Sequence, residues 1–190
     1  MDAAIETGTR ARTRRAILDA ALSVLADNPT ASLADIASAA GVGRTTIHRY
    51  FRERSDLLTA LGAHLLEQVT MATERARLHE GTAVEALDRL CQELFELGDG
   101  FRFSYEHPQL ATWADWDEES EADRALVRLI ERGHADGTID PRQPAQWVTA
   151  TLWAMLYAAW THSRDSCVPR HTALQLCLRS FRKSIAPGDP

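Results

Sequence analysis

The chain has 190 residues, of which 45% are hydrophobic, and a formal net charge of −6. This length allows one small and one larger hydrophobic core, so two domains are expected. The three cysteines are odd in number and are not spaced as metal ligands or as a redox pair, and the seven histidines are scattered without a His-x-x-x-His pair. We therefore expect free thiols, no metal site and a reducing, cytoplasmic location.

Charge is distributed unevenly along the sequence. Residues 1–54 carry eight arginines and six acidic residues, whereas residues 55–190 carry 13 basic and 21 acidic residues. The first part is therefore basic and the second strongly acidic. Such asymmetry suits a head that meets phosphates and a body that faces away from them, so the negative net charge does not exclude a nucleic-acid partner.

The first predicted helix follows an irregular start and ends at Asn28-Pro29. Apolar residues between Ile17 and Leu25 form one face of this helix. Four arginines between Arg10 and Arg15 lead into it. They are either a solvated helix start or an arm and flank that grips phosphates or the minor groove, and the sequence leaves both interpretations open.

Residues 32–58 predict two short helices joined by a tight turn and followed by a long third helix. Ser32 and Asp35 offer a capping box at the start of the first helix, along which apolar residues repeat on one face. Gly41 supplies the left-handed residue that a turn between crossing helices needs. The second helix runs from about residue 44 to residue 50. This arrangement is typical of a helix-turn-helix.

The second helix of this motif has an inner and an outer side. Ile47 and Phe51 lie four residues apart and should face the core. The outer side carries hydrogen-bond donors, because arginine can bind guanine or phosphate and threonine can contact phosphate or a thymine methyl. We predict that this side reads double-stranded DNA in the major groove. The predicted contacts are Arg44, Thr45, Thr46, His48, Arg49 and Tyr50.

The segment GVGRTTIHRYFRERSDLL resembles the signature of the TetR family of bacterial transcriptional regulators, and LADIASAAG resembles the helix before it. The resemblance in motif covers about the first third of the chain, and the remainder is similar in layout. It implies a homodimeric repressor that binds a palindromic operator and is released by a small molecule. It also places Arg54 where a lysine usually contacts phosphate.

The segment departs from the family pattern in three respects. His48 stands where tyrosine is usual, Gly43 stands where serine often caps the recognition helix, and Arg52-Glu53 replaces a common Pro-Ser pair. These differences imply a shorter phosphate contact, a weaker helix cap and an uncertain start for the next helix.

The rest of the chain predicts an all-α fold of about nine helices. We expect a helix-turn-helix DNA-binding domain at residues 10–55 and a helical ligand-sensing and dimerisation domain at residues 56–186. Residues 143–163 contain no Asp, Glu, Lys or Arg, and this length could span a bilayer. Polar residues interrupt the segment and its neighbours are amphipathic, so we expect a helix at a protein interface and no membrane partner.

The last two helices offer more apolar surface than one chain can readily cover. Alanines repeat every four residues on the charge-free helix, which lets two backbones approach, and larger apolar residues follow on the last helix. We predict a homodimer through a four-helix bundle, the alternative being that these faces are core within one chain. The predicted interface residues are Ala150, Ala154, Ala158, Leu174, Leu178 and Phe181.

Aromatic residues gather in an irregular connector and on the charge-free helix. The family resemblance implies an effector pocket, and these rings indicate a hydrophobic or aromatic small molecule, although plain core is the alternative for each ring. Carboxylates of Asp115 or Asp117 turned inward would favour a lipophilic cation, whereas capping of the next helix is their other role. The predicted ligand contacts are Phe101, Phe103, Tyr105, Trp113, Trp116, Trp153, Tyr157 and Trp160.

No pattern in the sequence indicates an enzyme or a cofactor. Adjacent acids such as those after Asp115 are more often a helix start than a catalytic pair. Two alternatives to a ligand-responsive regulator remain, namely a dimeric interaction protein that has lost specific DNA binding and a metal-dependent regulator. A gel shift with DNA upstream of the protein's own gene distinguishes the first, and metal analysis of the purified protein distinguishes the second.

Overall fold

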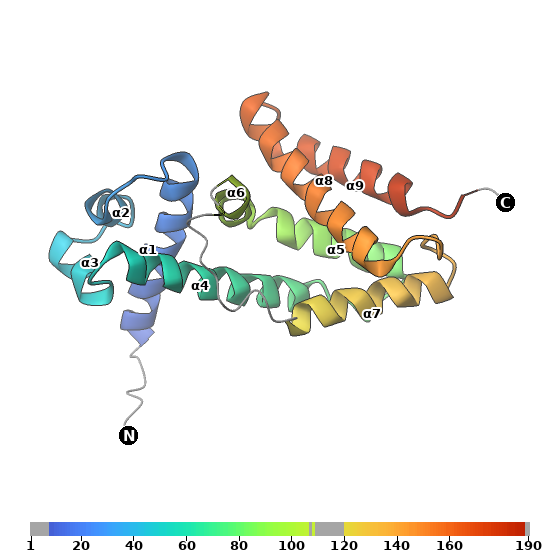
Figure 1. The fold of residues 1–190 in the computed structure, drawn as a ribbon, viewed down its shortest axis with the longest axis horizontal. Coiled ribbons are helices and arrows are strands. Elements are labelled where there is room, and N and C mark those ends of the chain that lie inside the picture. The colour runs from blue at the N-terminus through green and yellow to red at the C-terminus, as the bar shows by residue number, and fades with distance from the viewer. Residues whose placement is uncertain (1–7, 107, 109–119, 189–190) are drawn as a thin grey trace, which may run out of the picture. The chain divides into compact units, whose positions relative to one another are not determined.

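The computed structural model describes residues 8–106, 108 and 120–188. Over these residues the chain forms nine α-helices and no strand (Figure 1), which confirms the predicted all-α class. None of the helices in the described ranges is long and apolar enough to cross a membrane. The helices are α1 (Gly8–Asp27), α2 (Leu33–Ala39), α3 (Arg44–Tyr50), α4 (Arg54–Arg75), α5 (Ala83–Phe95), α6 (Gly98–Glu106), α7 (Glu121–Ala135), α8 (Ala145–Asp165) and α9 (Arg170–Ile185).

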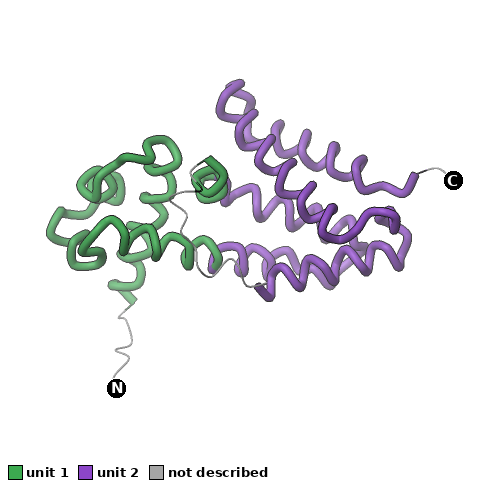
Figure 2. The backbone as a smooth tube through the Cα atoms, viewed as in Figure 1, with its two compact units in different colours: residues 1–66, 99–115 green, residues 67–98, 116–190 purple. Residues whose placement is uncertain are grey.

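The chain divides into two compact units (Figure 2). Unit 1 comprises residues 1–66 and 99–115, and unit 2 comprises residues 67–98 and 116–190. Helix α4 therefore passes from unit 1 into unit 2, and α6 belongs to unit 1 except for Gly98, although the chain before it belongs to unit 2. The predicted functional boundary between residues 55 and 56 stays a prediction.

The hydrophobic core of unit 1 is built around one face of α1. Its apolar residues recur at the spacing of a helix face and meet residues from α2, α3, the first turns of α4 and α6. A helix as short as α3 is marginal by itself, so this packing holds it in place. The largest fully buried members are Ile17, Leu18, Leu25, Ile36, Ile47, Leu57, Leu61 and Phe103.

The turns around the helix-turn-helix have the predicted chemistry. The Ser32 hydroxyl accepts from the Asp35 backbone N–H, while the Asp35 carboxylate accepts from the Ser32 backbone, which completes the capping box. Gly41 has a φ of +65°, the left-handed conformation expected of the turn. The Asp56 carboxylate accepts from the backbone N–H groups of Arg52 and Glu53 at 3.1 Å, which fixes the start of α4.

Unit 2 packs α8 along α9 and sets both against α5, with α7 beside α5 and α8. Capping boxes start two of its helices, Thr82 with Glu85 for α5 and Ser120 with Asp123 for α7. Charged side chains also cross between elements. The Arg89 guanidinium donates to three backbone carbonyls in the segment that follows α4.

The core position of α3 gives a test of stability. Replacing Ile47 by alanine removes a fully buried side chain, and we expect a loss of about 2–5 kcal/mol in the free energy of unfolding, measured by urea denaturation. The matched control is Thr45→Ala on the exposed side of the same helix, which should change stability by less than about 0.5 kcal/mol. Equal losses in the two variants would contradict the assigned facing of α3.

Candidate DNA-binding surface and sensing unit

Helix α3 turns one side into the core of unit 1 and leaves the other side open. Ile47 and Phe51 are buried, as their spacing predicts. Gly43 precedes the helix and has no side chain that could cap it. The backbone N–H groups in the first turn of α3 therefore receive no hydrogen bond from an N-cap side chain. The predicted contact residues Arg44, Thr45, His48 and Arg49 are exposed, and Thr46 and Tyr50 are half-buried.

The first turn of α1 lies against the end of α3. The Tyr50 hydroxyl donates to the backbone carbonyl of Arg10 at 3.3 Å, and the Arg49 guanidinium lies 5.6 Å from the centre of the Tyr50 ring. An open hollow of about 410 Å³ is lined there by Thr9, Arg10, Thr13, Arg49 and Tyr50. The sequence alone could not predict that Arg10 and Arg49 line one hollow, because 39 positions separate them.

The N-terminal arginines are therefore part of a helix over the described residues. Arg12 is turned to its own helix, where its Nε donates to the Gly8 carbonyl at 3.1 Å. The Arg14 guanidinium lies 5.8 Å from the centre of the Phe51 ring. From this group, Arg10 lines the hollow that Arg49 and Tyr50 of α3 also line.

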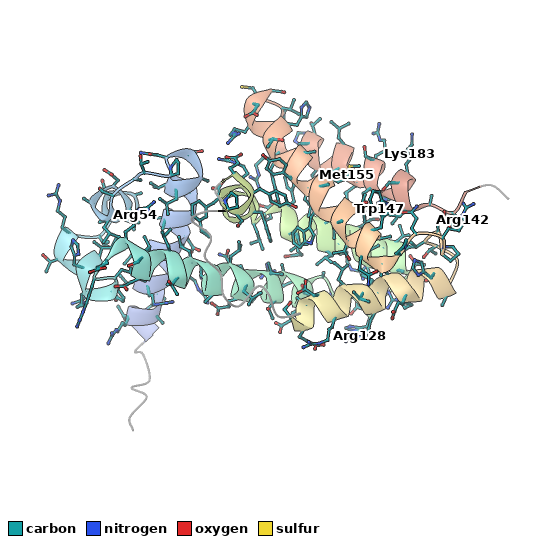
Figure 3. The ribbon with its side chains drawn as sticks, viewed as in Figure 1. Arg54, Arg128, Arg142, Trp147, Met155 and Lys183 are labelled. Carbon is teal, nitrogen blue, oxygen red and sulfur yellow. The ribbon has the colours of Figure 1, made fainter. Side chains whose placement is uncertain are left out.

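Arg54 has a role that the sequence did not predict. Its Nε and Nη2 donate to the backbone carbonyls of Ala31 and Pro29, in the connection between α1 and α2 (Arg54 is labelled in Figure 3). This side chain therefore ties the start of α4 to that connection. A phosphate contact from Arg54 stays a prediction.

The predicted effector residues divide between the two units. Phe101 and Phe103 of α6 are buried in unit 1, and Phe103 belongs to the core around α1, so core packing explains its position. Tyr105 is half exposed. Trp113 and Trp116 lie outside the described residues, as do Asp115 and Asp117.

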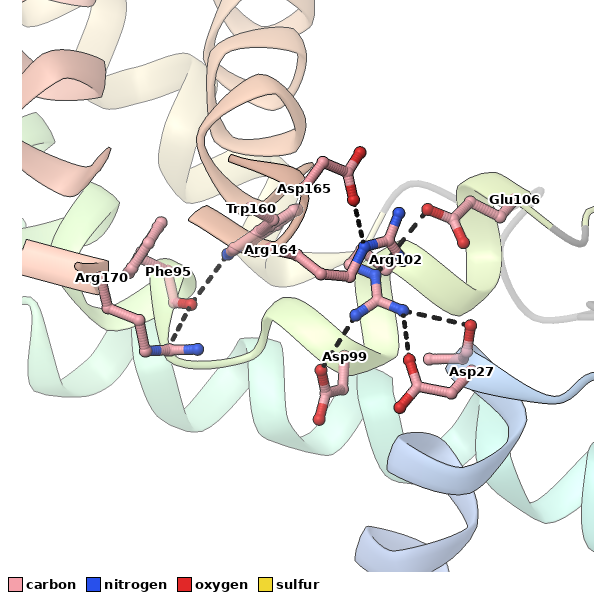
Figure 4. Close-up of polar contacts among 10 residues, drawn as sticks. Asp27, Phe95, Asp99, Arg102, Glu106, Trp160, Arg164, Asp165 and Arg170 are labelled. Carbon is pink, nitrogen blue, oxygen red and sulfur yellow. Dashed lines mark hydrogen bonds and ion pairs between the residues drawn. The ribbon is translucent and has the colours of Figure 1, made fainter. Parts of the chain in front are cut away.

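The three predicted effector contacts on α8 belong to unit 2. Trp160 is buried, donates from its indole N–H to the Phe95 carbonyl at 2.8 Å and stacks on the Phe95 ring at 6.4 Å between centroids, so it joins α8 to α5 (Figure 4). Trp153 and Tyr157 are half-buried and lie one helical turn apart. These two rings are the predicted contacts that unit 2 leaves partly open.

A groove in unit 2 was not predicted from the sequence. It has a volume of about 400 Å³, within the range of small-molecule sites. Hydrogen bonds from Arg128 and Arg124 lower the pKa of Glu121 at its edge. Its lining comes from the end of α4, the residues after it and the first turn of α7. The lining residues are Thr70, Thr73, Glu74, Arg77, Leu78, His79, Glu121, Ala122 and Ala125.

The outer face of α8 and α9 carries much of the predicted dimer surface. Ala150, Ala154 and Ala158 are exposed, and a shallow apolar hollow of about 350 Å³ lies between the two helices. Trp147 is 64% exposed and projects from α8, as does Met155 (Figure 3), and Leu176 of α9 is 43% exposed. None of these three residues is among the predicted interface residues.

The predicted dimer residues of α9 are placed differently. Leu178 and Phe181 are buried within the chain itself, because α9 packs on α8 and α5, and Leu174 is half-buried. Leu178 and Phe181 therefore belong to the alternative that the sequence left open, core within one chain. The exposed surface of α9 is provided by neighbours such as Leu176.

Two of the three free cysteines meet in unit 2, although their spacing in the sequence indicated no pair. A hydrogen bond between their side chains raises the pKa of the Cys91 thiol, which burial raises further, and lowers the pKa of the Cys177 thiol. Cys167 is exposed. Within the described residues no group of three or more potential ligands is placed to hold a metal ion.

Comparisons with known proteins agree with the geometry of unit 1. The family model for bacterial regulatory proteins of the tetR family matches residues 17–61, which begin in α1 and end in α4. The regulator NfxB of Pseudomonas aeruginosa is 34% identical over 80 residues, which cover 40% of this chain and 41% of that protein.

Similarity to one regulator extends over nearly the whole chain. The HTH-type transcriptional repressor LfrR of Mycolicibacterium smegmatis is 41% identical over 187 residues, covering 95% of this chain and 94% of that protein. The crystal structure of LfrR from Mycobacterium smegmatis in complex with proflavine matches with a TM-score of 0.74 at 39% identity, over 95% of this chain and 100% of that one. A regulator from Marinobacter aquaeolei shares the fold at 21% identity, with a TM-score of 0.72 over 96% of this chain and 100% of that one. The chain belongs to the TetR family of transcriptional regulators.

Proposed function

We propose that this regulator binds a palindromic operator as a cytoplasmic homodimer, represses transcription, and leaves the operator when unit 2 binds an aromatic small molecule. The exposed row of donors on α3 carries the DNA-binding part of the proposal. Repression is proposed from the whole-chain similarity to a transcriptional repressor. The DNA-binding surface itself does not indicate the sign of regulation, because an activator and a repressor would use the same surface.

Base reading is assigned to the exposed donors of α3. Arg44 and Arg49 can each fork onto the acceptors of a guanine, and Thr45 can contact a thymine methyl or a phosphate. Because Ile47 and Phe51 anchor the opposite side of the helix, these side chains enter the groove as one rigid set.

A triple variant tests the reading surface. Arg44→Ala, Thr45→Ala and Arg49→Ala together should remove sequence-specific binding in a gel shift, because each lost base contact costs about 1–3 kcal/mol. The control is Arg124→Ala on α7 in unit 2, which should bind as the wild type does. Unchanged operator affinity in the triple variant would support an interaction protein that has lost specific DNA binding.

The hollow between α1 and α3 predicts a phosphate contact. Arg10→Gln should weaken binding to all sequences about equally and reduce the slope of log affinity against log salt by about one. Arg12→Gln is a close control, because the Arg12 side chain is already bound to its own helix turn. A change of sequence preference in Arg10→Gln, or an unchanged salt slope, would contradict this assignment.

Dimerisation is assigned to the outer face of α8 and α9. Exposed alanines let a second backbone approach, and Trp147, Met155 and Leu176 offer apolar area that a second copy would cover. Two recognition helices in one dimer then meet two half-sites separated by a fixed distance on DNA.

A charge placed on that face tests the dimer. Ala154→Arg should give monomers in sedimentation velocity, because an arginine there would be buried without a partner. Ala135→Arg at the exposed end of α7 is the control and should remain dimeric. A dimer that persists in Ala154→Arg would move the interface elsewhere.

The effector site is assigned to the groove of unit 2 between the end of α4 and the first turn of α7. The LfrR structure contains proflavine, a planar aromatic cation, and in this chain the groove combines apolar side chains with the Glu74 carboxylate. Trp153 and Tyr157 of α8 are the competing location. To release the operator, the ligand must bind the non-binding state more tightly, since equal affinity for both states shifts nothing.

Proflavine titration distinguishes the two locations. We expect the wild type to bind proflavine, with binding measured by the quenching of tryptophan fluorescence. It should release operator DNA at the same proflavine concentrations. Glu74→Gln should weaken binding by about five- to tenfold, because it removes one charge pair of roughly 1 kcal/mol or more, whereas Trp153→Leu should leave affinity within twofold. The reverse result would assign the effector to α8, and no binding by the wild type would exclude proflavine-like effectors.

A further inference from the structure

Arg102 of α6 is a buried charge that joins α6 to the end of α1. The residue is only 6% exposed. Its Nη2 donates to the Ala26 carbonyl at 3.1 Å and to the Asp27 carboxylate at 3.0 Å (Figure 4). These are the last two residues of α1, whose final turn contains no basic residue of its own. Arg102 therefore supplies the positive charge that the negative end of the α1 dipole favours.

Two further carboxylates approach the same guanidinium from α6 itself. Asp99 Oδ1 lies 3.7 Å from Nη1, and Glu106 Oε1 lies 3.7 Å from Nε. Nε is buried and makes no hydrogen bond, because 3.7 Å to Glu106 is too long for one. A buried donor without an acceptor is costly, which favours any small shift that brings Glu106 closer. The Arg102 guanidinium is thus attracted by Asp27 of α1 and by Glu106 of its own helix.

The position of α6 gives this competition a consequence. A Cβ at Gly100 would lie 2.8 Å from Leu65 Cδ1, so α6 packs closely against α4 within unit 1. The chain enters α6 from unit 2 and later returns to unit 2. A displacement that begins in unit 2 can therefore pull on α6 along the chain, and Arg102 determines whether α1 moves with it.

We propose that Arg102 is the residue that couples α6 to the DNA-binding helices, with Asp27 holding it on α1 and Glu106 competing to draw it away. This inference rests on the proposed function insofar as it concerns effector release. The competition itself needs no effector. Arg102 acts through α1 and contacts neither DNA nor ligand in this role, so it is a positioning residue.

Thermal unfolding tests the competition without any ligand. In the wild type, loss of the Asp27 charge lets Arg102 shift to Glu106, so Asp27→Asn should lower Tm by only about 1–3 °C. With Glu106→Gln already present this compensation is absent, and the same substitution should lower Tm by about twice as much. Strictly additive effects would overturn the proposed competition. Arg75→Gln, which breaks an exposed pair with Glu93, is the control and should be additive with both.

Operator release tests the coupling. With proflavine as the probe, Asp27→Asn should raise the concentration for half-release by about three- to tenfold and Glu106→Gln should lower it, while proflavine affinity in the absence of DNA stays unchanged. A merely structural role would move both variants in one direction, and that result overturns the coupling. If the wild type is not released by proflavine, the effector assignment fails, and the unfolding experiment still decides whether Asp27 and Glu106 compete.

Discussion

The proposed DNA-reading surface depends on the burial of Ile47 and Phe51. Helix α3 has only seven residues and no side-chain cap at its start, so it would not persist without tertiary support. Burial of these two side chains against α1 and α2 fixes the rotation of the helix as well as its position. The exposed side chains of Arg44, Thr45 and Arg49 are consequently presented as a fixed set, which is what discrimination between base pairs requires.

A second constraint concerns charge inside unit 1. Burying a guanidinium is unfavourable unless it is paired, and Arg102 is placed where a helix end and three carboxylates offset that cost. The arrangement satisfies Arg102 incompletely, because its Nε lacks an acceptor. Arg54 shows the opposite case: its two described donors close on backbone carbonyls and hold the connection before α2. Arg54 thus holds its connection in one arrangement, whereas Arg102 has carboxylates of both α1 and α6 within reach.

Local features of the sequence predicted local structure well. The Ser32–Asp35 capping box, the left-handed Gly41 and the inner side of α3 depend on residues within one or two helical turns, and the structure confirms them. Features that join distant segments were not predictable. Arg10 beside Arg49 and Cys91 beside Cys177 arise from the packing of whole helices, which a spacing rule does not describe. Aromatic residues were the least informative, because an aromatic side chain suits a ligand contact and a hydrophobic core equally well. Phe103 was predicted as a ligand contact and lies in the core.

Footprinting of the DNA upstream of the protein's own gene measures operator binding and effector release in one experiment. A dimeric, effector-released repressor should give two protected half-sites related by a dyad, with their centres about one helical turn or more apart, and both protections should be lost together when proflavine is added. Protection of both half-sites would show two recognition helices acting in one dimer. Uniform protection independent of sequence, or a single half-site that proflavine does not affect, would contradict the proposal of a dimeric, effector-released repressor.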